Sequence, residues 1–502
     1  MNNDNTACVN TGGIYTARMN ITPFFPSWRP RLAPMGSRLA KTASPLRRLT
    51  LGQLESHFRA CVSESLFPKT SEKNNSRDRI YTQPRTFWSF LWQCLNPAAP
   101  CREAVRQIQA LSVLLDQQPA SSLTGAYCKA RKRLSKEGME KALHASAQAA
   151  RLRAPKDDFL QGRPVKAVDG TMLTLADTKA NQQSFPRVKN GHTEVGFPQM
   201  RVVVLFCLTS GAILARLTGN KHTSESRLFR QLFDALSPGD IVVADQGFGN
   251  FVMVSLLREL GVDFIARSDR RVDCRQGQRL GPKDRLVPWK KGGTPSAIMS
   301  RKHWNKQPEQ QWVRVIRGRI VQKGFRVKEM VLVTTLLDAQ IYPAKDILQA
   351  YLRRWRLEMC LDDLKTTLQM EQLRCKTPAM VQKELLAHLI AHNLIRWLMA
   401  GVARSHQQSL ERVSFKGTLD AFRQFSHAIA QGRSAHKRRE LWKTLLRAIA
   451  QDLVHERPGR REWRAVKRQH HKYPALTKPR ANFCDRIKRH ERRKLKRLRM
   501  GS

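Results

Sequence analysis

Short apolar runs, bounded by Gly, Pro and Asp, dominate the middle of the chain. The clearest is MRVVVLFCLT at 200–209, which is apolar at nearly every position, as in a strand buried on both faces. Five runs are predicted to be strands: 164–171, 200–209, 212–217, 241–245 and 262–266. Two segments with helical spacing of apolar residues are predicted to be helices: 224–236 and 250–260. The order strand-strand-strand-helix-strand-helix-strand predicts an α/β domain, and the first and fourth strands are expected to end at Asp169 and Asp245.

A second pattern lies in DILQAYLRRWRLEMCLDDLKTTLQM, residues 346–370. No Gly or Pro interrupts it, so it is expected to form one long helix. At 100° per residue, Tyr351, Arg354, Glu358 and Lys365 fall within about 60° of one another, beside a stripe of leucines. A carboxylate so flanked suits a metal ion, and the cations suit phosphates. The alternative is a surface helix with ion pairs four residues apart.

The spacing Tyr351-x2-Arg354-x3-Glu358-x6-Lys365 resembles the YREK motif of one large family of DDE transposases from bacterial insertion sequences. Trp355 and Arg356, just before the glutamate, also fit that family. Further segments agree with it: Asp169-Gly-Thr, Gly196-Phe-Pro, Pro238-Gly-Asp and Asp245-x-Gly-Phe. Gln246 stands where many relatives carry Arg. The resemblance covers about residues 120–400.

The resemblance implies a ribonuclease H-like mixed sheet in which the strands of Asp169 and Asp245 lie side by side. It implies that Asp169, Asp245 and Glu358 are the catalytic residues and the ligands of two Mg²⁺ ions, with Mn²⁺ as a substitute. Two such ions assist both the attacking and the leaving oxygen of a phosphodiester. Tyr351, Arg354 and Lys365 would bind DNA phosphates. Four other acids lie near these positions: Asp177, Asp240, Asp362 and Asp363. Of these, Asp362 could also face the site, because it lies one turn after Glu358.

The charge of the chain favours a polyanionic partner. Lys and Arg number 90 against 40 Asp and Glu, a net charge of +50, which favours nucleic acid over an acidic membrane surface, for which no amphipathic anchor is visible. The ten Cys include no CxxC pair, so neither a zinc ribbon nor a redox pair is supported, and scattered Cys suit a reducing cytosol. The apolar segment 385–402 contains His388, His392 and Arg396, expected to form a polar stripe of a soluble helix.

The flanking regions complete the predicted organisation. Residues 1–50 are expected to be disordered or an upstream extension, with Met35 as an alternative start. The other predicted regions are a helical DNA-binding domain at 51–155, a catalytic domain at 160–266 and 339–400, a β-rich insertion at 267–338, and a helical C-terminal region with a basic tail at 401–502. A basic cluster in the first of these is either a DNA contact or a solvated face: Lys129, Arg131, Lys132 and Arg133. Trp289, Trp304 and Trp312 of the insertion are candidates to hold a flipped base, with core packing as the alternative.

Together these features predict a DNA transposase that acts in the bacterial cytoplasm at the nucleoid, with no role at a membrane. It would bind the terminal inverted repeats of its own element as double-stranded DNA, cleave them, and join the 3′-OH ends to target DNA. The family implies a homodimeric synaptic complex, with Trp355, Arg356 and the basic cluster as further DNA contacts. Two alternatives remain: a nuclease of the same fold without strand transfer, and an inactive DNA-binding descendant.

Overall fold

The computed structural model describes ten ranges of the chain: 58–67, 80–97, 99–114, 118–155, 160–190, 193–268, 277–293, 297–319, 329–432 and 434–454. The predictions made for residues 1–50 and for the basic tail lie outside these described residues.

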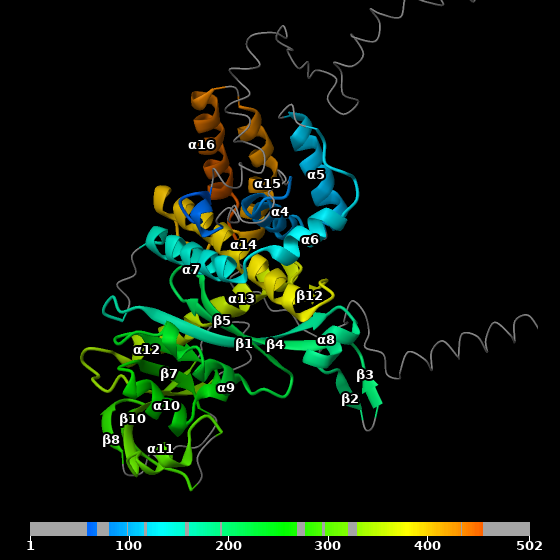
Figure 1. Ribbon diagram of the computed structural model, residues 1–502. Helices are drawn as coiled ribbons and strands as arrows, with labels where there is room; N and C mark the ends of the chain where they lie inside the picture. Colours follow the sequence, from blue (N-terminus) through cyan, green and yellow to red (C-terminus); the bar gives the residue numbers. More distant parts are fainter. Residues whose placement is uncertain are drawn as a thin grey trace, which may run out of the picture.

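A mixed sheet forms the centre of the fold (Figure 1). Its first five strands lie in the order β5-β4-β1-β6-β7. Their bounds are β1 Val165–Leu175, β4 Gln199–Cys207, β5 Ile213–Asn220, β6 Ile241–Ala244 and β7 Asp263–Arg267. β4 is antiparallel to both β1 and β5, whereas β1, β6 and β7 run parallel. A short strand, β12 (Gln372–Leu373), also pairs with β1. The predicted α/β class with a ribonuclease H-like mixed sheet is confirmed.

The segment predicted to be a β-rich insertion continues the same sheet. Its strands are β8 Gln278–Gly281, β9 Asp284–Lys290, β10 Gln310–Arg319 and β11 Glu329–Thr334. They follow β7 in the order β11-β10-β9-β8, and every one of these pairings is antiparallel. Helix α11 (Arg301–Asn305) and a separate hairpin of β2 (Val188–Asn190) and β3 (Thr193–Val195) complete the β-rich part.

The tryptophans of this segment are placed differently from one another. The rings of Trp289 and Trp304 pack edge-on against Phe251, at centroid distances of 6.3 and 5.7 Å. Both tryptophans therefore pack in the hydrophobic core that contains Phe251. Trp312 is 43% exposed.

Alternation along the strands assigns each face of the sheet to its own core. Ala167 and Val243 face one core, and their neighbours Val168 and Val242 face the other. The second core is covered by α9 (Glu225–Arg230), the short turns η2 (Phe233–Ala235) and η3 (Gln246–Phe248), and α10 (Phe251–Glu259). The first core is covered by α12 (Ala344–Arg353), α13 (Trp355–Asp362) and α14 (Pro378–Ser405), and it joins the core of the helical region.

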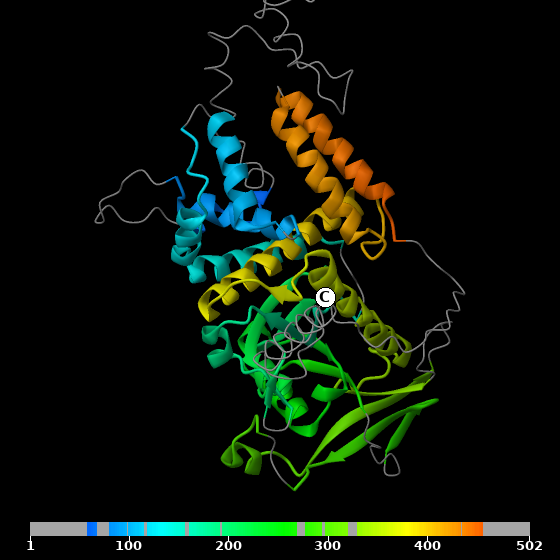
Figure 2. The same cartoon turned by 90° about the vertical axis from the view of Figure 1, so that its right-hand side faces the viewer.

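The helical region lies beyond that first face (Figures 1 and 2). Its elements are η1 Glu64–Leu66, α4 Gln83–Leu95, α5 Cys101–Leu114, α6 Gly125–Arg133, α7 Lys136–Arg153, α14 Pro378–Ser405, α15 Phe415–Gln431 and α16 Ala435–Gln451. A short helix, α8 (Lys179–Ser184), follows β1. Segments that come before and after the sheet strands along the chain thus form one helical layer.

Helix α14 differs from the predicted amphipathic helix with a solvated stripe. His388 and His392 are buried, and His392 Nε2–H donates to the carbonyl oxygen of Gly211 at 3.1 Å. Arg396 Nε–H donates to Ser210 O at 2.8 Å. Gly211, with a φ of +69°, forms the β4–β5 turn that these side chains hold. Among the described residues α14 alone is long and apolar enough to cross a membrane, and it is 89% buried within the protein. It is a core helix whose polar groups bind the sheet.

The long helix predicted for residues 346–370 is broken into three pieces. They are α12 Ala344–Arg353, α13 Trp355–Asp362 and the π-helical turn η4 Asp363–Thr367. At the first break, Arg354 N–H bonds to Tyr351 O and Leu357 N–H to Arg354 O, which tightens the turn to a spacing of three. At the second, Leu368 N–H bonds to Asp363 O, a spacing of five. The angular positions expected from a regular helix therefore do not hold across the segment.

Candidate active site

Two acidic side chains start from neighbouring strands at the centre of the sheet. The register pairs Val168 of β1 with Ala244, the last residue of β6, so Asp169 and Asp245 come next on adjacent strands. The strand predicted to end at Asp245 is β6, and it ends one residue earlier, at Ala244. The prediction that Asp169 ends its strand is wrong, because β1 continues to Leu175 along its other partner, β4. Asp169 lies where the parallel neighbour stops, which leaves its side chain room on that face.

The third acid comes from α13, which packs on the same face of the sheet. Arg354, at the junction of α12 and α13, lies between it and the first acid. Its Nη2–H donates to Glu358 Oε1 at 3.1 Å, and its Nη1 lies 3.8 Å from Asp169 Oδ2. The Tyr351 hydroxyl donates to Asp245 Oδ1 at 3.3 Å. The Arg354 guanidinium lies 5.5 Å from the centre of the Tyr351 ring. Asp169, Asp245 and Glu358 are thus joined through two side chains of the broken helix.

Burial decides the electrostatics of this cluster. The Asp169 side chain is 21% exposed, and loss of solvation raises its pKa to about 6, against the Gly170 N–H that it accepts at 2.8 Å and the charge of Arg354. Burial likewise raises the pKa of Tyr351 to about 12, so its phenol stays a donor. Burial opposes the charge of Arg354, but Tyr351 and the three acids together raise the pKa of the guanidinium. The site is a set of carboxylates short of positive charge.

The residues predicted to bind phosphate differ in whether they contact the three acids. The Arg354 side chain is 11% exposed, and its buried Nε–H donates to no group of the described residues. Lys365 lies on η4, half-buried, and no contact between it and the three acids is found in the described residues. Trp355 is 51% exposed beside the site, and Arg356 forms an ion pair with Glu411. Because the helix is broken, Lys365 does not share a helix face with Tyr351, Arg354 and Glu358 as the regular helix predicted.

One residue of the predicted basic cluster on α6 needs correction. Lys129, Lys132 and Arg133 are exposed, but Arg131 is only 7% exposed. Its guanidinium lies 3.9 Å from the centre of the Phe90 ring and donates to the Sγ atoms of Cys101 and Cys375, each at 3.1 Å. Arg131 faces inward because its face of α6 packs on α4, so the prediction of a DNA contact at Arg131 is wrong.

A fourth carboxylate near the site was missed from the sequence. Glu225, the first residue of α9, lies against the backbone of Gly170 from the other side of the sheet, where an added Cβ would be 2.5 Å from its Cδ. Its negative charge contributes to the raised pKa of Asp169, and Arg201 Nε lies 3.8 Å from its Oε1. The sequence shows there only an N-capping Ser224 followed by an acid, a pattern found at many helix starts.

Comparison with known proteins agrees with this geometry. Residues 160–394 match the family model of the transposase DDE domain, a range that contains all three acids, Tyr351 and Arg354. This range therefore forms a transposase DDE domain. The chain is 27% identical over 398 residues to the transposase InsG for insertion sequence element IS4 of Escherichia coli (strain K12), covering 77% of this chain and 86% of that relative.

Solved structures give a weaker likeness. A synaptic complex of piggyBac transposase with hairpin DNA has a TM-score of 0.37 at 11% identity and covers 85% of this chain and 86% of its own. A paired-end complex of Mos1 transposase with its left transposon end has a TM-score of 0.15 at 12% identity, covering 39% of this chain and 61% of its own. The fold assignment of the transposase rests instead on its strand order and on the domain match.

Proposed function

We propose that this transposase binds the inverted-repeat ends of its own insertion sequence, cleaves them by phosphodiester hydrolysis, and joins the freed 3′-OH ends to target DNA. The observation that carries the proposal is the convergence of Asp169, Asp245 and Glu358 on Arg354 and Tyr351. Such a reaction takes place on chromosomal DNA, which puts the protein at the bacterial nucleoid. The net charge of +50 suits that substrate.

The donor set fits divalent metal ions. Asp169, Asp245 and Glu358 offer hard carboxylate oxygens, which Mg²⁺ prefers, and Mn²⁺ has similar preferences. The described residues include no group of three or more His, Cys, Asp and Glu spaced to hold an ion; Arg354 is the cation that the acids share. Burial of Asp169 without full charge compensation also favours a bound cation. Bound at these acids, two ions would activate water and stabilise the leaving oxygen.

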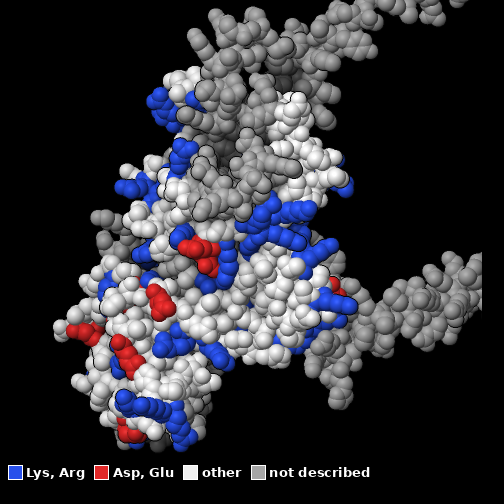
Figure 3. Space-filling view, viewed as in Figure 1, with Lys and Arg blue, Asp and Glu red and all other residues white. Residues whose placement is uncertain are grey.

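Other side chains of the site would then bind and orient DNA. Arg354 supplies one cation for a phosphate beside the three acids, and Lys365 supplies a second, about two turns after Glu358. The phenol of Tyr351 orients Asp245 through its hydrogen bond, which differs from the phosphate contact expected from the sequence. Exposed Lys129, Lys132 and Arg133 on α6 are proposed to bind the duplex further from the cut. On the face drawn in Figure 3, Lys and Arg lie over both the helical and the sheet parts.

A strand-transfer assay tests this function. Wild type and Asp169→Ala are incubated with Mg²⁺ and DNA that carries the element's own ends. Joined product from wild type alone is expected. Cut ends without joining would favour a nuclease of the same fold, and binding without cutting would favour an inactive descendant. Binding of end DNA should weaken steeply as salt rises from 50 to 200 mM, because neutralised phosphates release counterions.

We also propose that two copies of the chain act together, one on each end of the element. The assay for this uses end DNA of two lengths in a gel-shift experiment. A complex that contains one long and one short DNA is expected beside the two uniform complexes. Only uniform bands, each with a single DNA, would contradict a synaptic dimer.

A further inference from the structure

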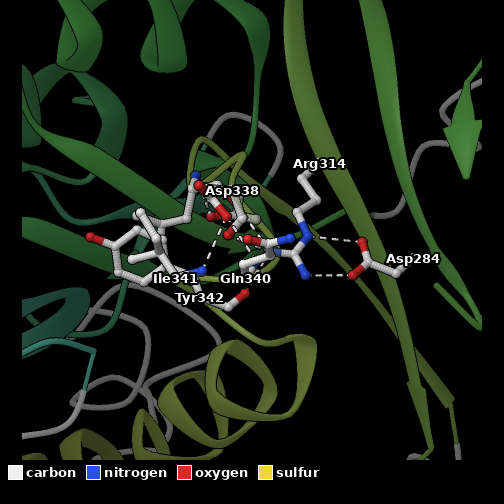
Figure 4. Close-up of polar contacts among 8 residues, drawn as sticks. Asp284, Arg314, Asp338, Gln340, Ile341 and Tyr342 are labelled. Atoms are coloured by element: carbon white, nitrogen blue, oxygen red, sulfur yellow. Dashed lines mark hydrogen bonds and ion pairs between the residues drawn. The ribbon is translucent and has the colours of Figure 1, made fainter. Parts of the chain in front are cut away.

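A buried arginine lies on one of the strands β8–β11, which extend the sheet beyond β7 and away from the strands of Asp169 and Asp245. Arg314, in the middle of β10, is 0% exposed. Its Nε–H donates to Asp284 Oδ1 at 2.8 Å, and its Nη2 pairs with Asp284 Oδ2 (Figure 4). Asp284 begins β9 and is itself buried. The pair is therefore a bidentate ion pair between neighbouring strands, and one edge of the guanidinium remains for other partners.

The other edge of the Arg314 guanidinium binds the loop that leads into α12. Arg314 Nη1–H donates to Tyr342 O at 2.6 Å, and lies 3.4 Å from the carbonyl oxygens of Leu336 and Asp338. The loop is curled around this point, because the Asp338 carboxylate accepts the N–H groups of Gln340 at 2.8 Å and Ile341 at 3.0 Å (Figure 4). Helix α12 begins two residues after Tyr342, and Pro343 at its N-cap makes no side-chain cap. The start of α12 is thus bound by Arg314.

A second contact joins the same strand to the same helix. Gly318 of β10 lies so close to Leu348 of α12 that an added Cβ would be 2.3 Å from Leu348 Cδ2. Glycine is needed here because of this close approach, as its φ is not in the left-handed region. β10 therefore contacts α12 at two places, once through the loop and once through the helix itself. Tyr351 and Arg354 follow on the next turn.

Stability alone is a weak reason for such a pair. Removing an arginine and a carboxylate from water costs free energy, and well-packed apolar residues often replace a buried ion pair without loss of stability. An apolar pair could join β9 to β10, but it could not also bind the three loop carbonyls. The guanidinium is therefore required to bind the loop before α12.

We propose that Arg314 is a positioning residue of the active site: by binding the carbonyl oxygens before α12, it sets the place of that helix and so of Tyr351 and Arg354 against Asp169 and Asp245. The inference rests on the proposed function for its catalytic consequence. The strands β8–β11 then have a role in catalysis that needs no contact with DNA. A small displacement of catalytic groups lowers rates by roughly 10- to 100-fold.

The decisive variant is Arg314→Lys. One ammonium group can keep the charge pair with Asp284 but cannot also reach the loop carbonyls on the opposite edge. The matched control is Arg216→Lys, the same change at an arginine of β5 whose side chain is 8% exposed and pairs with Glu140 at 3.5 Å. Gly318→Ala is a second test, because its Cβ would press on the Leu348 side chain of α12 without touching the ion pair.

Two measurements are made on the full chain: single-turnover cleavage at saturating end DNA and Mg²⁺, and hydrogen exchange of the amides of α12. Arg314→Lys should cleave about 10-fold or more slowly than Arg216→Lys, with the same affinity for end DNA, and its α12 amides should exchange faster. Gly318→Ala should share this signature. Equal cleavage rates and unchanged exchange in α12 would overturn the proposal, as would faster exchange throughout the sheet.

The exchange measurement separates this inference from the proposed function. If wild type binds end DNA but does not cut it, the proposed function fails, while faster exchange in α12 of Arg314→Lys would still support positioning. If Arg314→Lys does not fold, Gly318→Ala decides by the same two readouts. Unchanged α12 exchange and wild-type cleavage in Gly318→Ala would then overturn it.

Discussion

The two halves of the active site are held in place by different means. Asp169 and Asp245 are fixed by the ladder between β1 and β6, where backbone hydrogen bonds leave no freedom of register. Glu358 lies on α13 and Tyr351 on α12, with Arg354 at the break between these helices, and side chains hold α12: Arg314 at its start and Leu348 against Gly318. We therefore expect the strand half to tolerate changes around it and the helix half to depend on these few contacts. Substitutions in each half can test this difference.

The largest effect is expected from the acids themselves, whichever half they belong to. Asp169→Ala, Asp245→Ala and Glu358→Gln should each lower cleavage by more than about 10³-fold, because several kcal/mol of transition-state stabilisation are lost at tenfold per 1.36 kcal/mol. End binding should persist. The measurement is cleavage of labelled end DNA beside a gel shift. Retained cleavage in Glu358→Gln would move the third role to another acid, with Asp362 the first to test.

The strand half depends on α14, and acid should reveal it. Burial lowers the pKa of His388 to about 4 and that of His392 to about 3, so both are neutral in the folded chain. The unfolded chain binds protons below pH 6.5, so folding stability falls as pH drops from there towards these values. Between pH 6.5 and 5 the loss should be about 2 kcal/mol per histidine.

Urea unfolding at several pH values measures this dependence. His392→Gln should remove about half of the fall, since Gln can still donate to Gly211 O but cannot be protonated. The same variant at pH 7.5 serves as its own control. A pH slope identical to wild type would show that the two histidines do not control acid stability.

A smaller effect is expected from Tyr351→Phe, which cuts the one hydrogen bond between α12 and Asp245. Cleavage at saturating DNA should fall by about 10-fold, corresponding to a hydrogen bond to a charged group. Affinity for end DNA should not change if the phenol orients Asp245. Weaker DNA binding at an unchanged cleavage rate would instead favour the phosphate contact predicted from the sequence.

The smallest effect should come from Gly170→Ala in the strand half. Its Cβ would press on the far end of Glu225, a side chain that can swing away, so the ladder should stay intact. We expect a loss of less than about 1 kcal/mol of stability, in line with a small side chain that displaces a mobile group. Cleavage should change by only a few-fold. A loss as large as that of Gly318→Ala would show that the strand half is no more tolerant than the helix half.

Sequence reasoning reached one half of the site more fully than the other. The strands of Asp169 and Asp245 were predictable because apolar β-branched runs report burial in a sheet directly. Glu358 was predictable from the motif resemblance, but the helix around it was not. A regular wheel assumes one hydrogen-bond spacing, and the spacings of three and five at Arg354 and Leu368 violate it.

Other errors have a common origin in side-chain direction. Arg131 belongs to a cluster of four cations in sequence, yet its face of α6 packs on Phe90. His388, His392 and Arg396 resemble a solvated stripe, yet His392 and Arg396 donate to the backbone of the β4–β5 turn, and His388 is buried. The sequence pattern of a polar residue on a helix face is the same whether its partner is water or a distant backbone carbonyl.

The α/β class, the strand order along the chain, the basic character of the protein and the three acids of the DDE resemblance can be predicted from the sequence, because each depends on local pattern or on a motif. The tertiary structure determines which groups meet. It brought Glu225 against Gly170 and Arg314 against the loop before α12, and it placed Arg354 among the acids. These contacts join residues far apart in the chain, and no local periodicity records the packing of one element on another.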